Sequence, residues 1–356
     1  MSKVTWLDKL QEQVKVDIDC MDPAEAKRFL PFKPHDQTSN QRLVYEQMIS
    51  PKNRELFLKT VKEGKEGGWE VILDRMSALL CAKNIENIRG RVLLQTSAFH
   101  AYDTEKVVAQ ARSYAREFEK LGISKDRICI KIPCTGPALN ASPILLKEGI
   151  LTLGTSLFSV AQAIAASQAE TLSISPYYNF PWYHADREQW PNLKDPALDH
   201  PISPRIVQIQ QVYKHLHEAT GKTQPVLKPA SFISAREAMA MAELGCDHVT
   251  VPEDILLQLS LLDAEANPPP GGDSQMQIGT PSQRIAPMAQ IDSRASPVCS
   301  GLPALDIEYL ADNGAALTQA IAADPVTQRG LAEALEAFKA NELQSRDAIE
   351  EALKQF

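Results

Sequence analysis

The stretch Arg127-Ile-Cys-Ile-Lys-Ile-Pro133 is a short β-branched, apolar run that holds one interior charge, Lys131. A run of this length and composition predicts a buried strand of a parallel sheet. Burial disfavours the ammonium form of lysine, so such an amine can lose its proton near neutral pH and attack a carbonyl carbon. Taken alone, the segment fits equally a lysine whose stem lies along the core while its amine reaches solvent.

Similar runs recur along the chain and alternate with longer helical patterns, which is typical of repeated βα units. The predicted strands are Val14–Asp19, Asp36–Asn40, Val92–Ser97, Ile128–Pro133, Leu151–Thr155, Thr171–Pro176, Val226–Ser231 and His248–Val251. The predicted helices between them include Thr104–Leu121, Pro137–Glu148, Ser159–Ser167, Ile206–Ala219 and Ala235–Leu244. Eight such units predict an α/β fold of the (β/α)8 TIM-barrel type, with its active site at the carboxyl ends of the strands.

The alternation of strand and helix patterns stops after residue 263. We expect residues 1–263 to form the catalytic barrel and residues 264–302, which are rich in Pro, Gly, Ser and Gln, to form a long surface loop or a disordered segment. Two amphipathic patterns follow, Ala304–Ala323 and Pro325–Leu343. Residues 303–356 are therefore expected to add C-terminal helices that pack on the barrel or cover its mouth.

Composition excludes several classes of function. The chain has 356 residues, of which 44% are hydrophobic and 23% charged, with a net charge of -8. The acidic balance argues against a nucleic-acid partner and against anionic membranes. The sequence shows neither a membrane-spanning stretch nor the apolar core of a signal peptide near Met1, so we expect a cytoplasmic protein. A homodimer is possible.

Cysteine and histidine spacing gives no sign of a metal or a redox centre. The six cysteines are scattered, and none are two residues apart in the manner of a zinc or redox motif. The seven histidines show no paired helical ligand spacing. We therefore expect no metal and no cofactor.

Polar residues recur at the predicted strand ends. Because alternate side chains of a barrel strand point inward, these residues should meet Lys131 at one mouth. The set comprises Asp19, Asn40, Gln95, Thr155, Ser175, Tyr177 and Ser231. Individually each has a structural alternative: Asn40 or Ser231 could cap a helix, and Asp19 could pair with a distant cation.

From about Thr5 to Leu262 the sequence resembles the transaldolase family, including its smaller fructose-phosphate aldolases. The resemblance is carried in order by the motifs Gly122–Pro133, Leu145–Thr155, Leu157–Ala163, Ile174-Ser-Pro-Tyr177, Ala230-Ser-Phe232 and Asp36-Gln-Thr-Ser-Asn40. The last of these resembles the family's Asp-x-Thr-Thr-Asn segment, except that Gln41 replaces its usual proline.

The resemblance implies roles for these residues. Lys131 matches the Schiff-base lysine, and Asp19 matches a position that handles substrate hydroxyls and protons, which makes it the candidate base. Asn40 also matches a position that handles a bound dihydroxyacetone unit, and Thr38 in the same segment is expected to bind substrate. Ser175 and Ser231 fall at substrate-contact positions.

Departures from the pattern narrow the expected activity. Typical transaldolases carry glutamate at the position of Gln95 and phenylalanine at that of Tyr177, whereas the fructose-phosphate aldolases have glutamine and tyrosine. In those aldolases the two residues and a threonine, here Thr155, hold the water that releases free dihydroxyacetone. The sequence therefore predicts an aldolase-like enzyme.

The positions at which the family binds phosphate also differ in this sequence. Basic residues of the family are replaced here by Phe180 and Ile233, side chains without a hydrogen-bond donor for an anion. We expect a substrate that is poorly phosphorylated or more apolar, unless Arg187, Lys228 or Arg236 restores an anion site. Strand alternation predicts that Lys228 points away from the mouth, towards the helices. The aromatic loop from Phe180 to Trp190 should pack on the rim or wall the pocket.

Three hypotheses remain open. The first is an aldolase-type enzyme that acts on a small sugar, keto or aldehyde substrate through Lys131. The second is a conventional transaldolase that moves dihydroxyacetone between sugar phosphates in the pentose phosphate pathway. The third is a non-catalytic binding protein with the same barrel.

Overall fold

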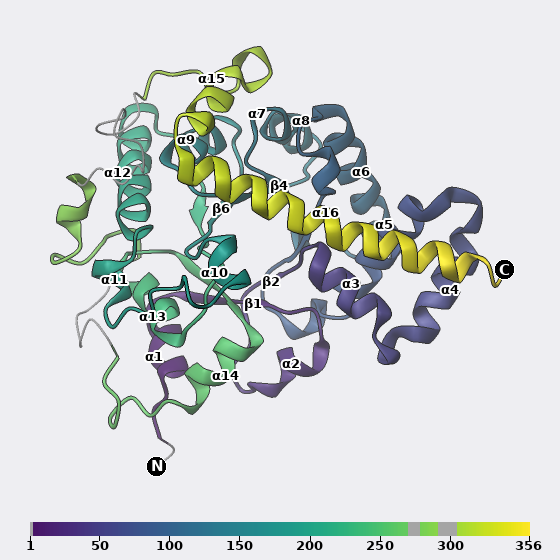
Figure 1. Cartoon of the computed structure of the whole chain (residues 1–356), viewed down its shortest axis with the longest axis horizontal. Coiled ribbons are helices and arrows are strands. Elements are labelled where there is room, and N and C mark those ends of the chain that lie inside the picture. The colour runs from purple at the N-terminus through teal and green to yellow at the C-terminus, as the bar shows by residue number, and fades with distance from the viewer. Residues whose placement is uncertain (1–2, 270–277, 291–304) are drawn as a thin grey trace.

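The computed structural model describes residues 3–269, 278–290 and 305–356 (Figure 1). Most of the predicted loop at 264–302, together with Cys299 and Ala304, lies outside the described residues. The five described cysteines are free thiols. Within the described ranges, no helix combines the length and apolarity needed to cross a bilayer.

Eight parallel strands form the centre of the molecule. They are β1 (Lys15–Asp19), β2 (Gln37–Thr38), β3 (Val92–Gln95), β4 (Ile128–Pro133), β5 (Thr152–Leu157), β6 (Ser173–Pro176), β7 (Val226–Leu227) and β8 (His248–Pro252). The sheet order is β7-β6-β5-β4-β3-β2-β1-β8. The amide of Thr250 donates to the carbonyl of Pro229 at 2.9 Å and links the two edges. The predicted (β/α)8 barrel is thereby confirmed.

Helices surround this sheet (Figure 1). They are α1 (Trp6–Gln13), α2 (Pro23–Arg28), α3 (Gln41–Ile49), α4 (Arg54–Gly64), α5 (Gly68–Ala82), α6 (Thr104–Lys120), α7 (Gly136–Leu139), α8 (Ala141–Leu146), α9 (Val160–Gln168), α10 (Pro181–Ala185), α11 (Pro196–Asp199), α12 (Ser203–Thr220), α13 (Ala235–Glu243), α14 (Glu253–Leu261), α15 (Ala311–Ala322) and α16 (Pro325–Leu353). The short 3-10 helix η4 (Ala98–His100) follows β3, and another, η6 (Ala286–Gln290), lies within the predicted loop.

Several predicted boundaries were wrong. The strand expected over Asp36–Asn40 is reduced to Gln37–Thr38, because Asn40 is already the N-cap of α3. The strand expected over Val226–Ser231 ends at Leu227, and Ser231 adopts a positive φ of 72°, which a regular strand does not allow. The helix predicted over Pro137–Glu148 is divided into α7 and α8 at Asn140.

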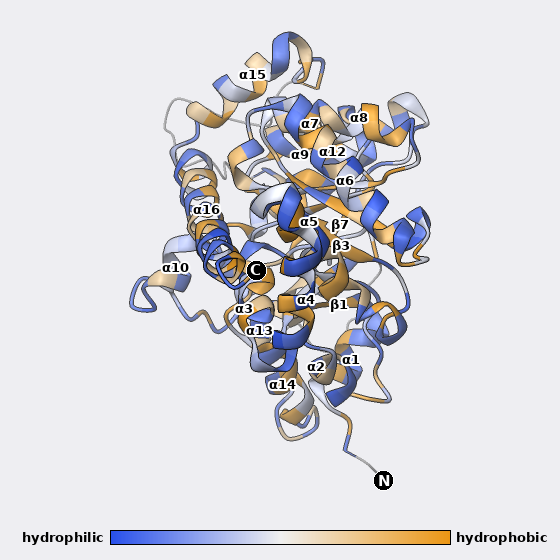
Figure 2. Ribbon diagram, turned by 90° about the vertical axis from the view of Figure 1, so that its right-hand side faces the viewer, coloured by the Kyte–Doolittle hydropathy of each residue, from blue (hydrophilic) through white to orange (hydrophobic). Residues whose placement is uncertain are grey.

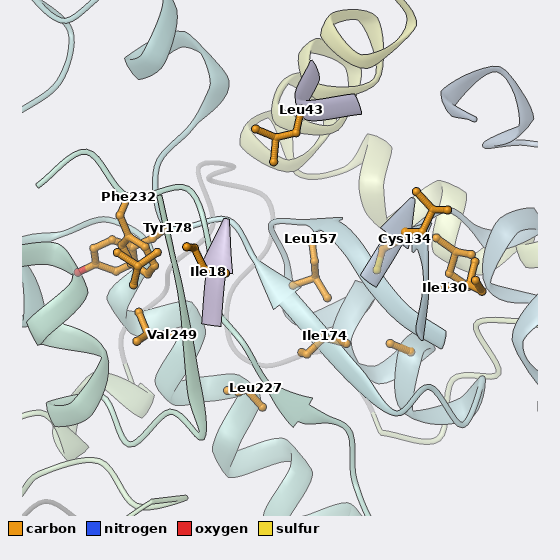
Figure 3. Close-up of a cluster of buried hydrophobic side chains, with 14 of the residues drawn as sticks. Ile18, Leu43, Ile130, Cys134, Leu157, Ile174, Tyr178, Leu227, Phe232 and Val249 are labelled. Carbon is orange, nitrogen blue, oxygen red and sulfur yellow. The ribbon is translucent and has the colours of Figure 1, made fainter. Parts of the chain in front are cut away.

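Apolar side chains fill the space between the strands and the surrounding helices. Figure 3 shows part of this core, including Ile18, Ile130 and Ile174, all of which are buried. Figure 2 shows the same division, with orange strands inside and blue patches on outer helices such as α5 and α16. Leu93, Cys129 and Leu153 form a second, smaller apolar cluster from the adjacent strands β3, β4 and β5. Because these residues alternate with the core residues of the same strands, they lie inside the barrel.

A polar cluster accompanies that layer. The ammonium of Lys228 contacts the carboxylates of Asp17, at 3.0 Å, and of Asp36, and all three side chains are buried. Nδ1 of His248 lies 3.0 Å from the same Asp17 carboxylate. The prediction that Lys228 points towards the helices was therefore wrong. Counting back from Ser231 fails because β7 ends at Leu227 and Ser231 has a positive φ, so strand alternation does not extend to Ser231. The carboxylates of Asp17 in β1 and of Asp36 just before β2 hold the amine.

The C-terminal helices lie across the barrel. Helix α15 begins at Ala311, later than predicted, and α16 runs ten residues beyond the predicted end at Leu343, to Leu353. Helix α16 contacts α3, η4, β5 and α10, which follow or form the carboxyl ends of strands (Figure 1). It therefore covers the side of the barrel on which the predicted mouth lies.

Candidate active site

Lys131 lies on β4 with only 6% of its surface exposed. Its ammonium nitrogen donates to the hydroxyl of Thr38 at 2.8 Å and to the carbonyl of Ser39 at 3.0 Å. Neither acceptor is charged, so desolvation prevails and lowers the pKa of the amine to about 8. A measurable fraction of this amine is therefore a neutral nucleophile at neutral pH.

Asp19 ends β1 at the same mouth. Burial raises the pKa of its carboxyl, while the nearby charge of Lys131 opposes that rise. One of its oxygens, Oδ1, is buried and has no hydrogen-bond partner. A carboxyl group with a raised pKa and a free oxygen beside an amine can accept and return a proton.

Gln95 is the residue aligned with Lys131 on the neighbouring strand β3. It is 2% exposed, and both its amide nitrogen and its amide oxygen are buried without partners. Buried amide groups are nearly always hydrogen-bonded, so an amide left free in this position is suited to a ligand or a water molecule.

Thr155 of β5 and Tyr177, which follows β6, meet at the same mouth. Their hydroxyl oxygens lie 3.2 Å apart, and Thr155 aligns with Pro133 at the end of β4. Burial raises the pKa of the Tyr177 phenol, so it remains protonated and can donate. The pair brings two hydroxyl groups to the mouth.

The segment after β2 places two more of the predicted residues. Thr38 accepts the hydrogen bond from Lys131, and Asn40 follows at the start of α3. The side-chain oxygen of Asn40 accepts from the amide of Leu43 at 3.0 Å, so Asn40 is indeed a helix cap. Its amide nitrogen is not used in that bond and can still donate.

Ser231 is engaged by its neighbours. Its hydroxyl donates to the carbonyl of Asn179 at 2.8 Å, and Nε2 of His184 lies 2.7 Å from the same hydroxyl oxygen. Since the serine proton is used on Asn179, the imidazole must be the donor in the second contact. Ser231 therefore has no donor left for an anion. Ser175 is buried on β6, near this position.

Phe180 and Ile233 were expected to replace basic residues. The ring of Phe180 stacks on that of Trp182 with centroids 4.4 Å apart, and it is 5% exposed. Arg329 of α16 lies over the other ring, 4.0 Å from the Trp182 centroid. The aromatic loop is therefore packed against the C-terminal helix, a contact that the sequence did not predict. Ile233 is half-buried beside α13.

Two arginines, Arg187 and Arg42, act on the imidazole that contacts Ser231. Burial by surrounding chain, together with the charges of Arg187 and Arg42, lowers the pKa of His184, although part of that residue is exposed. Arg42 pairs with Glu46 at 2.9 Å on the exposed side of α3. The imidazole is thus neutral at pH 7, in agreement with its role as a hydrogen-bond donor to Ser231.

One group of potential metal ligands occurs among the described residues. Donor atoms of Asp17, His35, Asp36 and His248 lie within 4.8 Å of one another. The Lys228 ammonium already contacts both carboxylates, and main-chain amides of Asp36 and Arg91 also donate to them. The donor set is thus engaged in an internal ion network, in the layer below Lys131.

Sequence reasoning missed some functional neighbours. His184 lies in the aromatic loop, where nothing in the sequence marked it as a site residue. Ser39 acts through its main-chain carbonyl, which has no sequence signal, and Arg42 lies outside the family motifs. Glu342 of α16 also reaches this region, since it lines a cavity together with Asn40 and Gln95. No local pattern marks a residue that is joined to its site by folding alone. A cavity of about 460 Å³ lies elsewhere, lined by residues of α1, of α14 and of the segment from Arg28 to Phe32.

Comparison with known proteins agrees with this geometry. The sequence profile named transaldolase/fructose-6-phosphate aldolase matches residues 16–349. A transaldolase from Rhizobium leguminosarum bv. trifolii is 31% identical over 262 residues, which cover 71% of this chain and 77% of that protein. A transaldolase from Methylococcus capsulatus is 30% identical over 278 residues, covering 74% and 80%.

Solved structures give only distant similarity. A putative phosphonomutase from Burkholderia cenocepacia aligns with a TM-score of 0.40 at 9% identity, over 69% of this chain and 88% of that chain. A 2,3-dimethylmalate lyase gives 0.38 at 13% identity, over 80% and 94%. These scores are too low to carry an argument. The family profile and the relatives decide the matter: the chain belongs to the transaldolase/fructose-6-phosphate aldolase family of enzymes.

Proposed function

We propose that this enzyme is a class I aldolase that cleaves or forms a ketose carbon–carbon bond through a Schiff base on Lys131. The observation that carries the proposal is the environment of that amine. It is buried, its pKa is lowered to about 8, and it is bonded only to a hydroxyl and a carbonyl. A structural lysine buried to this extent is normally paired with a carboxylate, as Lys228 is with Asp17 and Asp36.

The proposed chemistry begins with addition of the Lys131 amine to the C2 carbonyl of a ketose. Loss of water from the carbinolamine gives an iminium. The carboxylate of Asp19 then takes the proton of the C4 hydroxyl while the bond between C3 and C4 breaks. That electron pair moves into the iminium and gives an enamine, and the aldehyde leaves.

Release of the three-carbon unit is assigned to Gln95, Thr155 and Tyr177. The enamine takes a proton at C3, and a water molecule held by these three residues adds to the iminium and frees dihydroxyacetone. The free amide of Gln95 and the Thr155–Tyr177 pair support this assignment. Transfer to a second aldehyde, the reaction implied by the name of the relatives, is the alternative fate of the same enamine.

We propose further that the substrate is poorly phosphorylated. Ser231 uses its proton on Asn179, and the ring of Phe180 is packed against Trp182. Neither residue can donate to a phosphate dianion, which is usually bound by arginine in a bidentate manner. Asn40, Thr38 and Ser175 remain to bind hydroxyl groups of the three-carbon unit, while Ile233 adds apolar surface.

Borohydride trapping tests the covalent step. Incubation with dihydroxyacetone and borohydride should give one stable adduct, located on Lys131 by mass analysis. Lys131→Met, which keeps chain length but removes the amine, should abolish both the adduct and turnover. Lys147→Met, which changes a lysine on the α8 side of the same barrel, is the matched control and should be trapped as wild type. An adduct elsewhere, or turnover by Lys131→Met, would overturn the proposal.

A substrate screen separates the remaining alternatives. Dihydroxyacetone is paired with phosphorylated and unphosphorylated aldehydes, and free dihydroxyacetone is measured with and without an acceptor. We expect release without an acceptor, and at least tenfold higher kcat/KM for unphosphorylated aldehydes. Ordinary affinity for fructose 6-phosphate or erythrose 4-phosphate would refute the substrate class, and release only in the presence of an acceptor would establish a conventional transaldolase. Absence of all turnover would favour a binding protein.

A further inference from the structure

Helix α16 carries a buried carboxyl group next to the site, that of Glu342. The residue is 4% exposed. Its Oε1 accepts a hydrogen bond from the hydroxyl of Ser97 at 2.6 Å, across 245 positions of sequence. Its other oxygen, Oε2, is buried and has no partner. Burying a carboxyl group with one oxygen unsatisfied costs free energy, so such a group suggests a functional role.

Ser97 joins this carboxyl group to the catalytic strand pair. It lies two residues after Gln95, and the intervening Thr96 donates its amide to the carbonyl of Lys131 at 3.0 Å. The phenol of Tyr114 donates to the carbonyl of Gln95 at 3.1 Å. The backbone from Gln95 to Ser97 is therefore held between Lys131 on one side and Glu342 on the other.

A small cavity is lined by the residues that carry the unsatisfied groups. It measures about 20 Å³, and its lining includes Asn40, Gln95 and Glu342. One water molecule needs about 10–15 Å³ and two to four polar partners. Oε2 of Glu342 and the side-chain amide of Gln95, which are buried and unbonded, are the candidate partners. The cavity therefore suits one bridging water.

We propose that Glu342 is a positioning residue for Gln95, and that its carboxyl group and one water in the shared cavity fix which end of the Gln95 amide faces the bound substrate. This inference rests on the proposed function. It adds an ionisable group, Glu342, to a site in which Gln95, the residue proposed to hold the water, cannot ionise.

The two protonation states of Glu342 have opposite effects. An ionised carboxylate only accepts, and its negative charge favours the positive nitrogen end of the nearby amide; the bridging water then donates to Oε2 and accepts from Nε2 of Gln95. The amide oxygen of Gln95 then faces the substrate, where it can accept a hydrogen bond from the water that attacks the iminium, while the carboxylate of Asp19 takes the proton. A protonated Glu342 donates to the bridging water, which then donates to the amide oxygen and turns the nitrogen towards the substrate. Hydrolysis is favoured in the first state only.

Burial, together with two acidic neighbours, places this change near neutral pH. Burial is the largest cause that raises the pKa of Glu342, to about 7, and Asp74 and Glu70 of α5 add to it. Asp74 itself has a raised pKa of about 6. From α6 the uncharged Tyr114 faces the group, and from η4 His100, whose pKa is lowered by burial, bonds to Gln110 of α6. Titration of Glu342 therefore falls within the working range of an enzyme.

The test compares the full-length wild type with Glu342→Gln, which keeps the shape and the acceptor for Ser97 but cannot ionise. Two rates are measured from pH 5.5 to 9: borohydride trapping of dihydroxyacetone on Lys131, and release of free dihydroxyacetone from ketose. We expect the ratio of release to trapping to show a rising limb near pH 7 in the wild type that disappears in Glu342→Gln, with release at pH 8 reduced at least tenfold. Trapping should change less than twofold.

The matched control is Glu336→Gln, which removes the same charge from an exposed position of the same helix. It should match the wild type in both rates, and Glu342→Asp should restore the rising limb in part. An unaltered release profile in Glu342→Gln would overturn the inference while leaving Lys131 chemistry intact. A wild type that gives no adduct at any pH would refute the proposed function itself, and this inference with it.

Discussion

At the scale of single residues, the state of the Lys131 amine sets the rate of the first covalent step. With its pKa lowered to about 8, about a tenth of the amine is neutral at pH 7. We predict that trapping of dihydroxyacetone rises close to tenfold between pH 6 and 7, and reaches a plateau above pH 8. Rapid mixing with borohydride at each pH measures this rate.

Asp19 provides the control for that profile. Its charge raises the pKa of Lys131, in opposition to burial. Asp19→Asn should therefore move the rising limb to lower pH, although it removes the base needed for bond cleavage. A wild-type limb that still rises at pH 10 would indicate an ordinary solvated lysine and contradict the prediction.

The sequence predicted the positions of those candidate residues that lie on regular strands, because side chains alternate along a strand. Lys131 and Gln95 lie on regular parts of β4 and β3, and their alignment follows from the parallel pairing. Ser231 lies beyond the end of β7, where a positive φ changes the direction of the chain. Its partner His184 comes from a separate loop, so no spacing rule joins the two residues.

At the scale of elements, α15 is attached through two glycines. Gly314 has a φ of 80°, and a Cβ at that position would overlap the main chain of Gly136 in α7. We predict that Gly314→Ala destabilises the protein by more than the strain of positive φ alone, which costs about 1–2 kcal/mol. Urea unfolding measures the total, and hydrogen exchange in residues 311–322 reports whether α15 has detached.

Gly122 gives a matched control for this prediction. Its φ is 73°, but a Cβ there would meet nothing within 4 Å. Gly122→Ala thus introduces the strain without the overlap. Equal losses of stability in the two variants would show that the contact between Gly136 and Gly314 contributes nothing.

The elements themselves were predictable where periodicity was long and unbroken. Helix α6 was expected over Thr104–Leu121 and is found over Thr104–Lys120, and β4 has the expected bounds. The short strands β2 and β7 have two residues each, and only their pairing with neighbours defines them as strands. Such pairing is a property of the closed barrel and leaves no local signal in the sequence.

At the scale of the whole molecule, the C-terminal helix joins distant parts of the barrel. The buried ion pair between Arg205 of α12 and Asp324, 2.9 Å apart, anchors the start of α16. Asp324 is also the N-cap of that helix. The far end of α16 contacts α3 and α5, and Glu342 lies between the two ends, above β3. The sequence predicted a helix here, but its position over the mouth follows from these tertiary contacts.

The burial of Glu342 gives the molecule a pH-dependent stability that one variant can isolate. Folding raises the pKa of this carboxyl from 4.5 to about 7, so its full contribution to stability is present below pH 4.5 and is lost as pH rises through 7. Glu342→Gln cannot ionise and avoids that loss. We predict equal stability of the two proteins near pH 4.5, and a Glu342→Gln variant that is more stable at pH 8 by on the order of 2 kcal/mol. Urea unfolding at both pH values measures the difference. Because Asp74 is retained in both proteins, its own raised pKa largely cancels in the comparison. A variant that is destabilised equally at both pH values would show that Glu342 acts through packing, without an ionisation step.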